Sequence, residues 1–155
     1  MTYIKLTCLC LLVCLVGTAC RTVPVSSRKQ LLLSSENYEN ELGATAYAEY
    51  KKQYPRSTNK TYTESLNRVG KAISKVAQKD DYQWEFIVLE SKDANAFCLP
   101  GGKVAVYSGI FQFTANEAEL ATVVAHEIAH ALARHGGERM SMAQLQQIGS
   151  LGLKS

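Results

Sequence analysis

The sequence predicts an α+β fold in which a small β-sheet packs against helices. Apolar residues follow helical spacing at 35–54 and 61–79, and alternate with polar residues at 82–88. A second strand signal at 95–107 is interrupted by Pro-Gly-Gly, and a nearly continuous apolar segment at 118–133 contains the pentapeptide His-Glu-Ile-Ala-His. The chain has 155 residues, of which 46% are apolar and 20% charged, values ordinary for one globular domain.

Two N-terminal helices are expected before the sheet. The first runs from Ser35 and ends at Pro55, and Gly43 within it predicts a close packing contact, because a helical glycine costs about 1 kcal/mol relative to alanine. The expected buried stripe of this helix is Tyr38, Leu42, Ala46 and Tyr50. The second helix begins with a capping box of Thr61 and Glu64 and extends to about Lys79. Its apolar positions are Leu66, Val69, Ile73, Val76 and Ala77.

The strand patterns come next in the chain. Residues 82–88 predict a strand with one buried face, and 95–107 predict a β-hairpin with its turn at 100–102. Two interpretations of the hairpin remain open. It is either an ordinary core hairpin or an edge strand beside a cleft, pairing with an extended substrate by strand addition. In the second case the substrate-binding residues are Ala96, Phe97, Cys98, Gly101 and Gly102.

The apolar segment at 118–133 predicts a buried helix that carries a zinc site. Thr114 and Glu117 form a capping box at its start. His126 and His130 are four residues apart, so both imidazoles leave the same face and can hold one zinc ion per chain. Glu127 projects about 100° away from His126. It therefore misses the metal but reaches a water whose pKa the zinc lowers, as a general base for peptide-bond hydrolysis.

The alternative interpretation of this pentapeptide is two core histidines and a glutamate paired with Arg134. The zinc interpretation is favoured because three polar residues in a buried helix need a compensating partner, which a cation supplies.

The first nineteen residues have the pattern of a signal peptide. Lys5 precedes an apolar core and a small-residue cleavage site at 17–19, followed by Cys20. Cys20 resembles the lipidated cysteine of bacterial lipoproteins, which predicts a membrane anchor followed by a tether over residues 20–34. Simple secretion after Ala19 and an uncleaved signal that anchors the chain are the other two interpretations.

The remaining cysteine and the net charge further limit the possible functions. Cys98 is the only cysteine beyond residue 20, and it is interpreted either as a small buried hydrophobe or as a thiolate that inhibits or switches a nearby zinc. The formal net charge of +3 is spread along the chain without a basic stripe, which argues against a nucleic-acid partner.

Four ordered motifs resemble one family. They are Asn95 to Gly102, Tyr107 to Ile110, Asn116 to Leu120, and His126 to His130 with the following Arg134 to Gly136. Together they resemble the HtpX/BepA/LoiP family of zinc metallopeptidases, to which the mitochondrial Oma-type protease is similar. The resemblance implies a zincin-like gluzincin fold, zinc ligation by His126 and His130, and Glu127 as general base. It also implies membrane-associated endopeptidase work on misfolded or unassembled envelope proteins.

One departure from the family affects the metal site. The resemblance implies a third zinc ligand, a glutamate on a later helix, and the chain stops at Ser155 before such a helix appears. The expected organisation is therefore a signal peptide at 1–19, a lipid-anchored tether at 20–34 and an incomplete metallopeptidase domain at 35–155. The alternative function is a non-catalytic envelope lipoprotein that binds unfolded clients or a partner protease.

Overall fold

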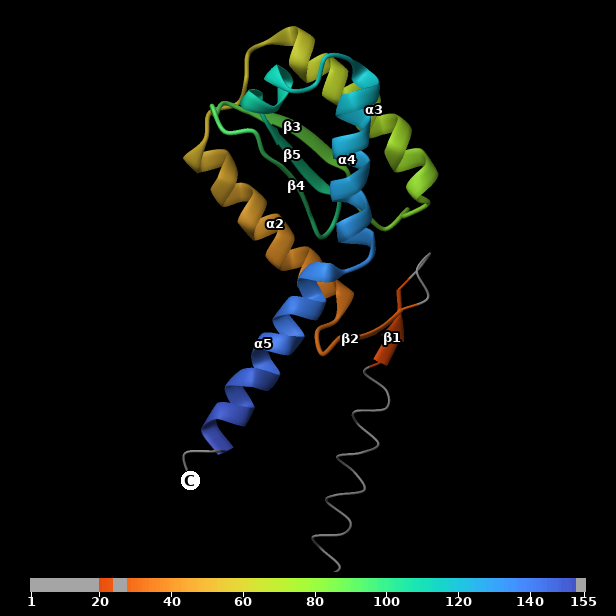
Figure 1. Ribbon diagram of the computed structural model, residues 1–155, viewed down its shortest axis with the longest axis vertical. Coiled ribbons are helices and arrows are strands. Elements are labelled where there is room, and N and C mark those ends of the chain that lie inside the picture. Colours follow the sequence, from red (N-terminus) through yellow and green to blue (C-terminus); the bar gives the residue numbers. More distant parts are fainter. Residues whose placement is uncertain (1–19, 24–27, 153–155) are drawn as a thin grey trace, which may run out of the picture. The chain divides into compact units, whose positions relative to one another are not determined.

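The computed structural model describes residues 20–23 and 28–152 (Figure 1). These residues form two compact units. The larger unit is 36–132, and the described residues up to Ser35 group with those from Ala133 onward. The observed division therefore does not coincide with the expected boundary between a tether and a domain of 35–155. The predicted signal peptide lies outside the described residues.

The larger unit has three layers, and its sheet forms the middle one (Figure 1). The strands are β3 (Glu85–Leu89), β4 (Ala96–Leu99) and β5 (Lys103–Tyr107), in the spatial order β3-β5-β4. Central β5 pairs in parallel with β3 and antiparallel with β4. The predicted hairpin is confirmed, and a 3₁₀ helix, η1 (Ser108–Gln112), follows it.

Helices cover both faces of this sheet. One face packs on α2 (Glu36–Gln53), and the other packs on α3 (Lys60–Ala77) and α4 (Glu117–Leu132) (Figure 1). Val88 faces the α3–α4 side, whereas Ile87 and Leu89 face α2. The prediction of a strand with one buried face is therefore wrong, because β3 is covered from both sides. The α+β class is confirmed.

Helix α2 buries a different face from the expected one. Tyr38 and Leu42 are exposed, whereas Gly43 and Tyr47 are buried. A Cβ atom added to Gly43 would collide with the backbone carbonyl of Pro100, which confirms the predicted close contact at this glycine. The helix turns this side towards the sheet because the missing side chain lets the two backbones approach.

The caps of α3 and α4 are asparagines rather than the expected threonines. Asn59 accepts a hydrogen bond from the Tyr62 N–H at 3.3 Å. Asn116 accepts one from the Glu119 N–H at 3.0 Å, and the Glu119 carboxylate accepts one from the Ala115 N–H at 2.9 Å. The capping boxes proposed at Thr61 and Thr114 are therefore wrong by two residues. Asparagine satisfies the free N–H groups of a first turn at least as well as threonine does.

The second compact unit contains the described part of the expected tether. Strands β1 (Cys20–Thr22) and β2 (Lys29–Leu31) pair antiparallel. Arg28 forms a two-point ion pair with Glu138 of α5 (His135–Gly152), at 2.5 and 2.7 Å, and the Leu33 N–H donates to the Ser141 hydroxyl at 2.9 Å. Of the expected tether, residues 20–22 and 28–33 therefore take part in strand pairing or in contacts with α5, and the lipid anchor stays a prediction.

The helix that carries the pentapeptide ends close to its expected boundary. The sequence predicts an apolar helix at 118–133, and α4 ends at Leu132, so Gly136 and Gly137 lie within α5. Arg134 has a positive φ of 54°, a left-handed conformation that stops a helix. In the part of the chain that the structure describes, no helix is long and apolar enough to span a membrane.

A buried lysine at the start of the central strand β5 predicts a pH dependence of stability. Lys103 Nζ donates to the Glu85 carboxylate at 2.7 Å and to the Gln83 carbonyl at 2.7 Å. The hydrogen bond from Lys103 is the main cause that lowers the pKa of Glu85. A carboxylate with a lowered folded-state pKa stabilises the fold above its unfolded value of about 4.3, and this stabilisation is lost as the pH falls through the lower folded value.

We therefore expect Glu85→Gln to flatten the decline in stability below about pH 4.3. The effect should stay below about 1 kcal/mol because the Glu85 side chain is half exposed to solvent. Urea unfolding of the parent and variant between neutral and acidic pH measures it. Parallel pH profiles would contradict the assigned role of the pair.

Candidate active site

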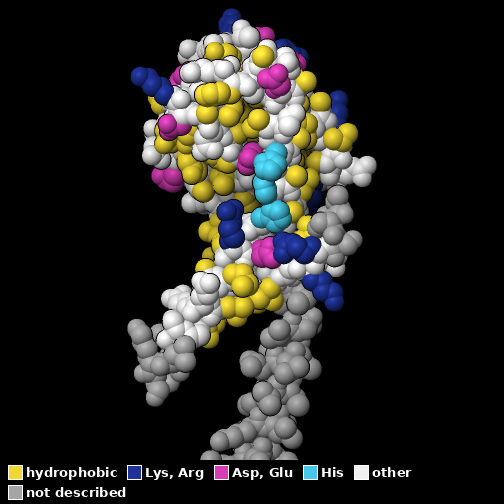
Figure 2. Space-filling model, in the orientation of Figure 1, with side chains coloured by type: hydrophobic (Ala, Val, Ile, Leu, Met, Phe, Trp, Pro, Cys, Tyr) yellow, Lys and Arg dark blue, Asp and Glu magenta, His cyan; other side chains and the backbone are white. Residues whose placement is uncertain are grey.

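The pentapeptide lies in the middle of α4, and the helix presents two of its side chains to solvent. His126 and His130 are exposed and Glu127 is half-buried. The two Nε2 atoms lie 3.0 Å apart, with the ring planes nearly perpendicular at 88°. Figure 2 shows histidine side chains at the surface of the larger unit, bordered by hydrophobic ones.

The prediction that this helix is buried all round is wrong for the histidine face. The opposite face carries the fully buried Leu120, Val124 and Ile128, which pack on the sheet and on α3. Ala125 and Ala129 are exposed beside the histidines, because an apolar residue as small as alanine does not oblige a helix to bury that face. Arg134, the partner in the alternative interpretation of Glu127, donates to the Ser34 carbonyl at 2.9 Å.

The two imidazoles fit a shared zinc ion. Two nitrogen ligands at about 2.0–2.1 Å from a tetrahedral zinc lie about 3.3 Å apart, close to the 3.0 Å observed here. Neutral imidazole is a common zinc ligand. Because both rings are exposed on one face, the other coordination positions of a bound zinc ion would be open. Within 20–23 and 28–152, no cluster of three or more metal-binding side chains is present.

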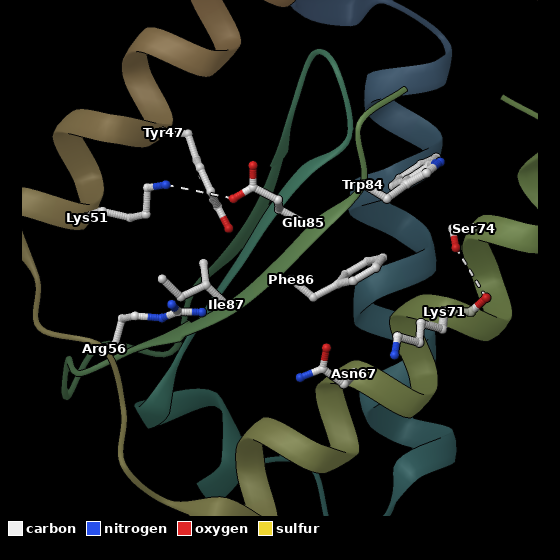
Figure 3. A pocket seen from close by; sticks show the side chains of 10 residues that line it. All are labelled: Tyr47, Lys51, Arg56, Asn67, Lys71, Ser74, Trp84, Glu85, Phe86 and Ile87. Carbon is white, nitrogen blue, oxygen red and sulfur yellow. Dashed lines mark hydrogen bonds and ion pairs between the residues drawn. The ribbon is translucent and has the colours of Figure 1, made fainter. Parts of the chain in front are cut away.

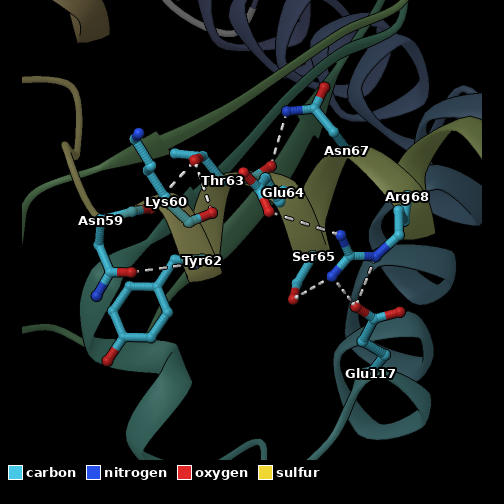
Figure 4. A network of polar contacts seen from close by, with 9 residues as sticks. All are labelled: Asn59, Lys60, Tyr62, Thr63, Glu64, Ser65, Asn67, Arg68 and Glu117. Carbon is cyan, nitrogen blue, oxygen red and sulfur yellow. Dashed lines mark hydrogen bonds and ion pairs between the residues drawn. The ribbon is translucent and has the colours of Figure 1, made fainter.

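The start of α4 is fixed by a polar network that sequence reasoning missed (Figure 4). Arg68 of α3 donates to Glu117 from Nε at 3.0 Å and from Nη2 at 2.6 Å. The guanidinium hydrogen bond lowers the pKa of Glu117, which therefore stays ionised where the helix dipole favours negative charge. Because Arg68 and Glu117 are far apart in sequence, no local pattern indicates the pair. The network and the apolar contacts hold the histidines on a rigid element.

The predicted substrate-binding residues divide between the two faces of β4. Ala96 and Cys98 pack on the apolar cluster that contains α4 residues Val124 and Ile128. Phe97 points to the opposite face, where its ring lies 4.5 Å from that of Tyr50. Gly101 and Gly102 form the turn with φ values of 82° and 80°. The structure thus brings Ala96 and Cys98 towards α4 but not Phe97, since neighbouring strand residues face opposite ways.

The backbone of β4 supports the edge-strand interpretation. β4 is an outer strand, and the Tyr107 N–H donates to the Asn95 carbonyl at 2.9 Å. Residues alternate in the side to which their backbone groups point, so Phe97 pairs with β5 while Ala96 and Cys98 point to the open edge. The Ala96 N–H donates to the Asn95 side chain at 2.9 Å. The Asn95 side chain therefore already accepts a hydrogen bond from the first backbone N–H group of this edge. The sequence did not indicate this role.

Cys98 is a half-buried thiol. Its pKa is raised to about 12, mainly by burial and also by the nearby charge of Glu127. A thiol with this pKa stays protonated at neutral pH, which favours the small-hydrophobe interpretation over the thiolate.

Several known proteins are similar to this chain in sequence. Residues 60–154, well over half of the chain, match peptidase family M48. The chain is 37% identical to the mitochondrial metalloendopeptidase OMA1 of Schizosaccharomyces pombe over 125 residues, 79% of this chain and 37% of that protein. It is 47% identical to OMA1 of Saccharomyces cerevisiae over 76 residues, 48% of this chain and 21% of the relative.

A bacterial relative matches as well. The β-barrel assembly-enhancing protease of Escherichia coli is 33% identical over 94 residues, 58% of this chain and 19% of that protein. The chain therefore spans about a third or less of the length of these curated relatives.

Proposed function

The chain belongs to peptidase family M48, and we propose that it carries the catalytic helix of a zinc-dependent metalloendopeptidase. The observation that carries the proposal is the pair of exposed imidazole nitrogens 3.0 Å apart, with the half-buried Glu127 beside them on the same helix. His126 and His130 are two of the zinc ligands. A catalytic zinc normally has three protein ligands, so we infer that a third ligand completes the site.

The roles of the side chains follow from their positions. A zinc ion bound by His126 and His130 would supply a Lewis acid for the scissile carbonyl and an activated water. Glu127 leaves the helix about 100° away from His126, so its carboxylate is free to take a proton and return it to the leaving amine. The outward N–H and C=O groups of Cys98 on β4 align an extended substrate by strand pairing.

The substrate class and location are part of the same proposal. We infer that the substrates are misfolded or unassembled proteins, whose extended segments fit a strand edge. The likeness to a bacterial protease named for β-barrel assembly supports a place in the cell envelope. Lipidation of Cys20 would attach the protein to a membrane facing the periplasm. Cys20 is the first residue of β1.

Metal analysis and a cleavage assay together test the function. The protein is purified as its own gene encodes it, and zinc per chain is measured beside cleavage of unfolded casein. We expect about one zinc per chain, and loss of both zinc and cleavage in His126→Ala and His130→Ala. His135→Ala is the matched control, because His135 lies on α5 outside the pentapeptide. If both histidine variants bind zinc as the parent does, the assignment of His126 and His130 as ligands is overturned. If the parent binds zinc but cleaves no casein, the alternative of a non-catalytic binding protein is favoured.

A further inference from the structure

A second site lies at the outer edge of β3, in a cavity of about 350 Å³ (Figure 3). This volume is within the range of about 300–1,000 Å³ that is usual for ligand sites. Side chains from α2, α3 and β3 line it. Strand β4, whose residues contact α4, is at the other edge of the sheet. The cavity is thus separate from the histidine motif.

The backbone at this edge is paired only in part. The Ser57 N–H donates to the Val88 carbonyl at 2.9 Å, and the Glu90 N–H donates to the Pro55 carbonyl at 2.8 Å. Phe86 is two residues before Val88, so its N–H and C=O groups point to the same outer side. Glu85 points inward, because its N–H donates to the Gly102 carbonyl at 2.9 Å. The start of β3 therefore offers an edge to which another extended segment can add.

The charges around this edge are mostly positive. Lys51, Arg56 and Lys71 line the cavity, together with the single acid Glu85. The Glu85 carboxylate is already engaged by Lys103 at 2.7 Å and by Lys51 at 3.7 Å. Arg56 and Lys71 are exposed, and neither forms an ion pair with another residue of the described chain. The cavity therefore has an unbalanced positive charge that complements carboxylates.

The cavity also has apolar and hydrogen-bonding surfaces. The rings of Trp84 and Phe86 are stacked, with centroids 6.2 Å apart and planes inclined by 6°. Asn67 donates from its amide nitrogen to the Thr63 carbonyl at 2.7 Å, which orients its amide in the cavity wall. In Figure 3 the Phe86 ring extends from the strand towards α3, between Lys71 and Asn67 on one side and Arg56 on the other. Apolar and acidic side chains of one extended segment would both find partners here.

We propose that this cavity binds an extended acidic segment of a partner protein, which adds to the outer edge of β3. The backbone of the bound segment pairs with Phe86 of β3. It lies along the same strand edge as residues 55–57, which pair with the end of β3. Its carboxylates bind Arg56 and Lys71, and its alternate apolar side chains lie against Trp84 and Phe86. The docking is independent of the proposed peptidase activity.

Peptide binding tests the charge requirement. The probe is a fluorescein-labelled nonapeptide of alternating glutamate and valine, and binding to the full chain carrying Glu127→Gln is followed by fluorescence anisotropy. We expect saturable, salt-sensitive binding that weakens on the order of tenfold in Lys71→Glu and in Arg56→Glu. Lys75→Glu is the matched control, since it makes the same charge change on α3 outside the cavity wall. It should stay within about twofold of the parent.

Modified peptides test the strand pairing. A probe N-methylated at alternate residues in one register loses the N–H groups that pair with β3, and the complementary register keeps them. We expect one methylated probe to bind at least about tenfold more weakly than the other. Equal binding of both would overturn the edge addition. Two other results would overturn the proposal that the cavity binds an acidic segment. One is equal peptide binding by Lys71→Glu, Arg56→Glu and the control variant. The other is binding of inorganic phosphate without binding of the peptide.

Discussion

Replacement of Glu127 by glutamine should leave zinc bound and reduce cleavage of unfolded casein by about 10²- to 10⁴-fold. The amide has nearly the same shape as the carboxylate but cannot take up a proton. His126 and His130 keep their positions because the buried residues on the opposite face of α4 are unchanged. Initial rates of casein cleavage and the zinc content of the same samples measure both expectations.

Glu41→Gln is a suitable control for this experiment. Glu41 is an exposed glutamate of α2, which covers the face of the sheet opposite to α4, so its replacement removes one negative charge without affecting α4. We expect parental cleavage from this variant. Cleavage at the parental rate by Glu127→Gln would exclude Glu127 as the general base, even if zinc and both histidines are required.

Local patterns predicted the main helices and strands and the placement of the two histidines on one helix face. The motif of α4 depends only on helical spacing, which places His126 and His130 on one face in any context. The hairpin was predictable for the same reason, since Gly101 and Gly102 adopt the positive φ values that its turn requires. These features are set by residues close together in the sequence.

Features set by contacts between distant residues were not predictable. The buried face of α2 is chosen by the approach of Gly43 to Pro100, not by its apolar residues, so Tyr38 and Leu42 are exposed. Phe97 faces away from α4 because the register of β4 against β5 decides its direction. The order of residues 28–34 depends on α5, more than a hundred positions later in the chain.

Substitution of Gly43 by alanine should destabilise the larger unit by about 2–3 kcal/mol or more. The new Cβ atom would overlap the backbone carbonyl of Pro100, which cannot rotate away as a side chain would. The overlap forces α2 away from the sheet and weakens the packing of Tyr47 on Ile87 and Ala105. Urea unfolding followed by the fluorescence of Trp84, the single tryptophan of the chain, reports on this unit.

Gly149→Ala separates this overlap from the general effect of removing a helical glycine. A Cβ atom at Gly149 meets no atom within 4 Å, and alanine favours a helix by about 1 kcal/mol over glycine. The control should therefore leave the Trp84 transition unchanged, whereas Gly43→Ala lowers its midpoint despite the same gain in helix propensity. If Gly43→Ala raised the midpoint instead, α2 could not lie against Pro100 as described. Gly43 would then be a tolerated helix residue and would not determine which face α2 buries.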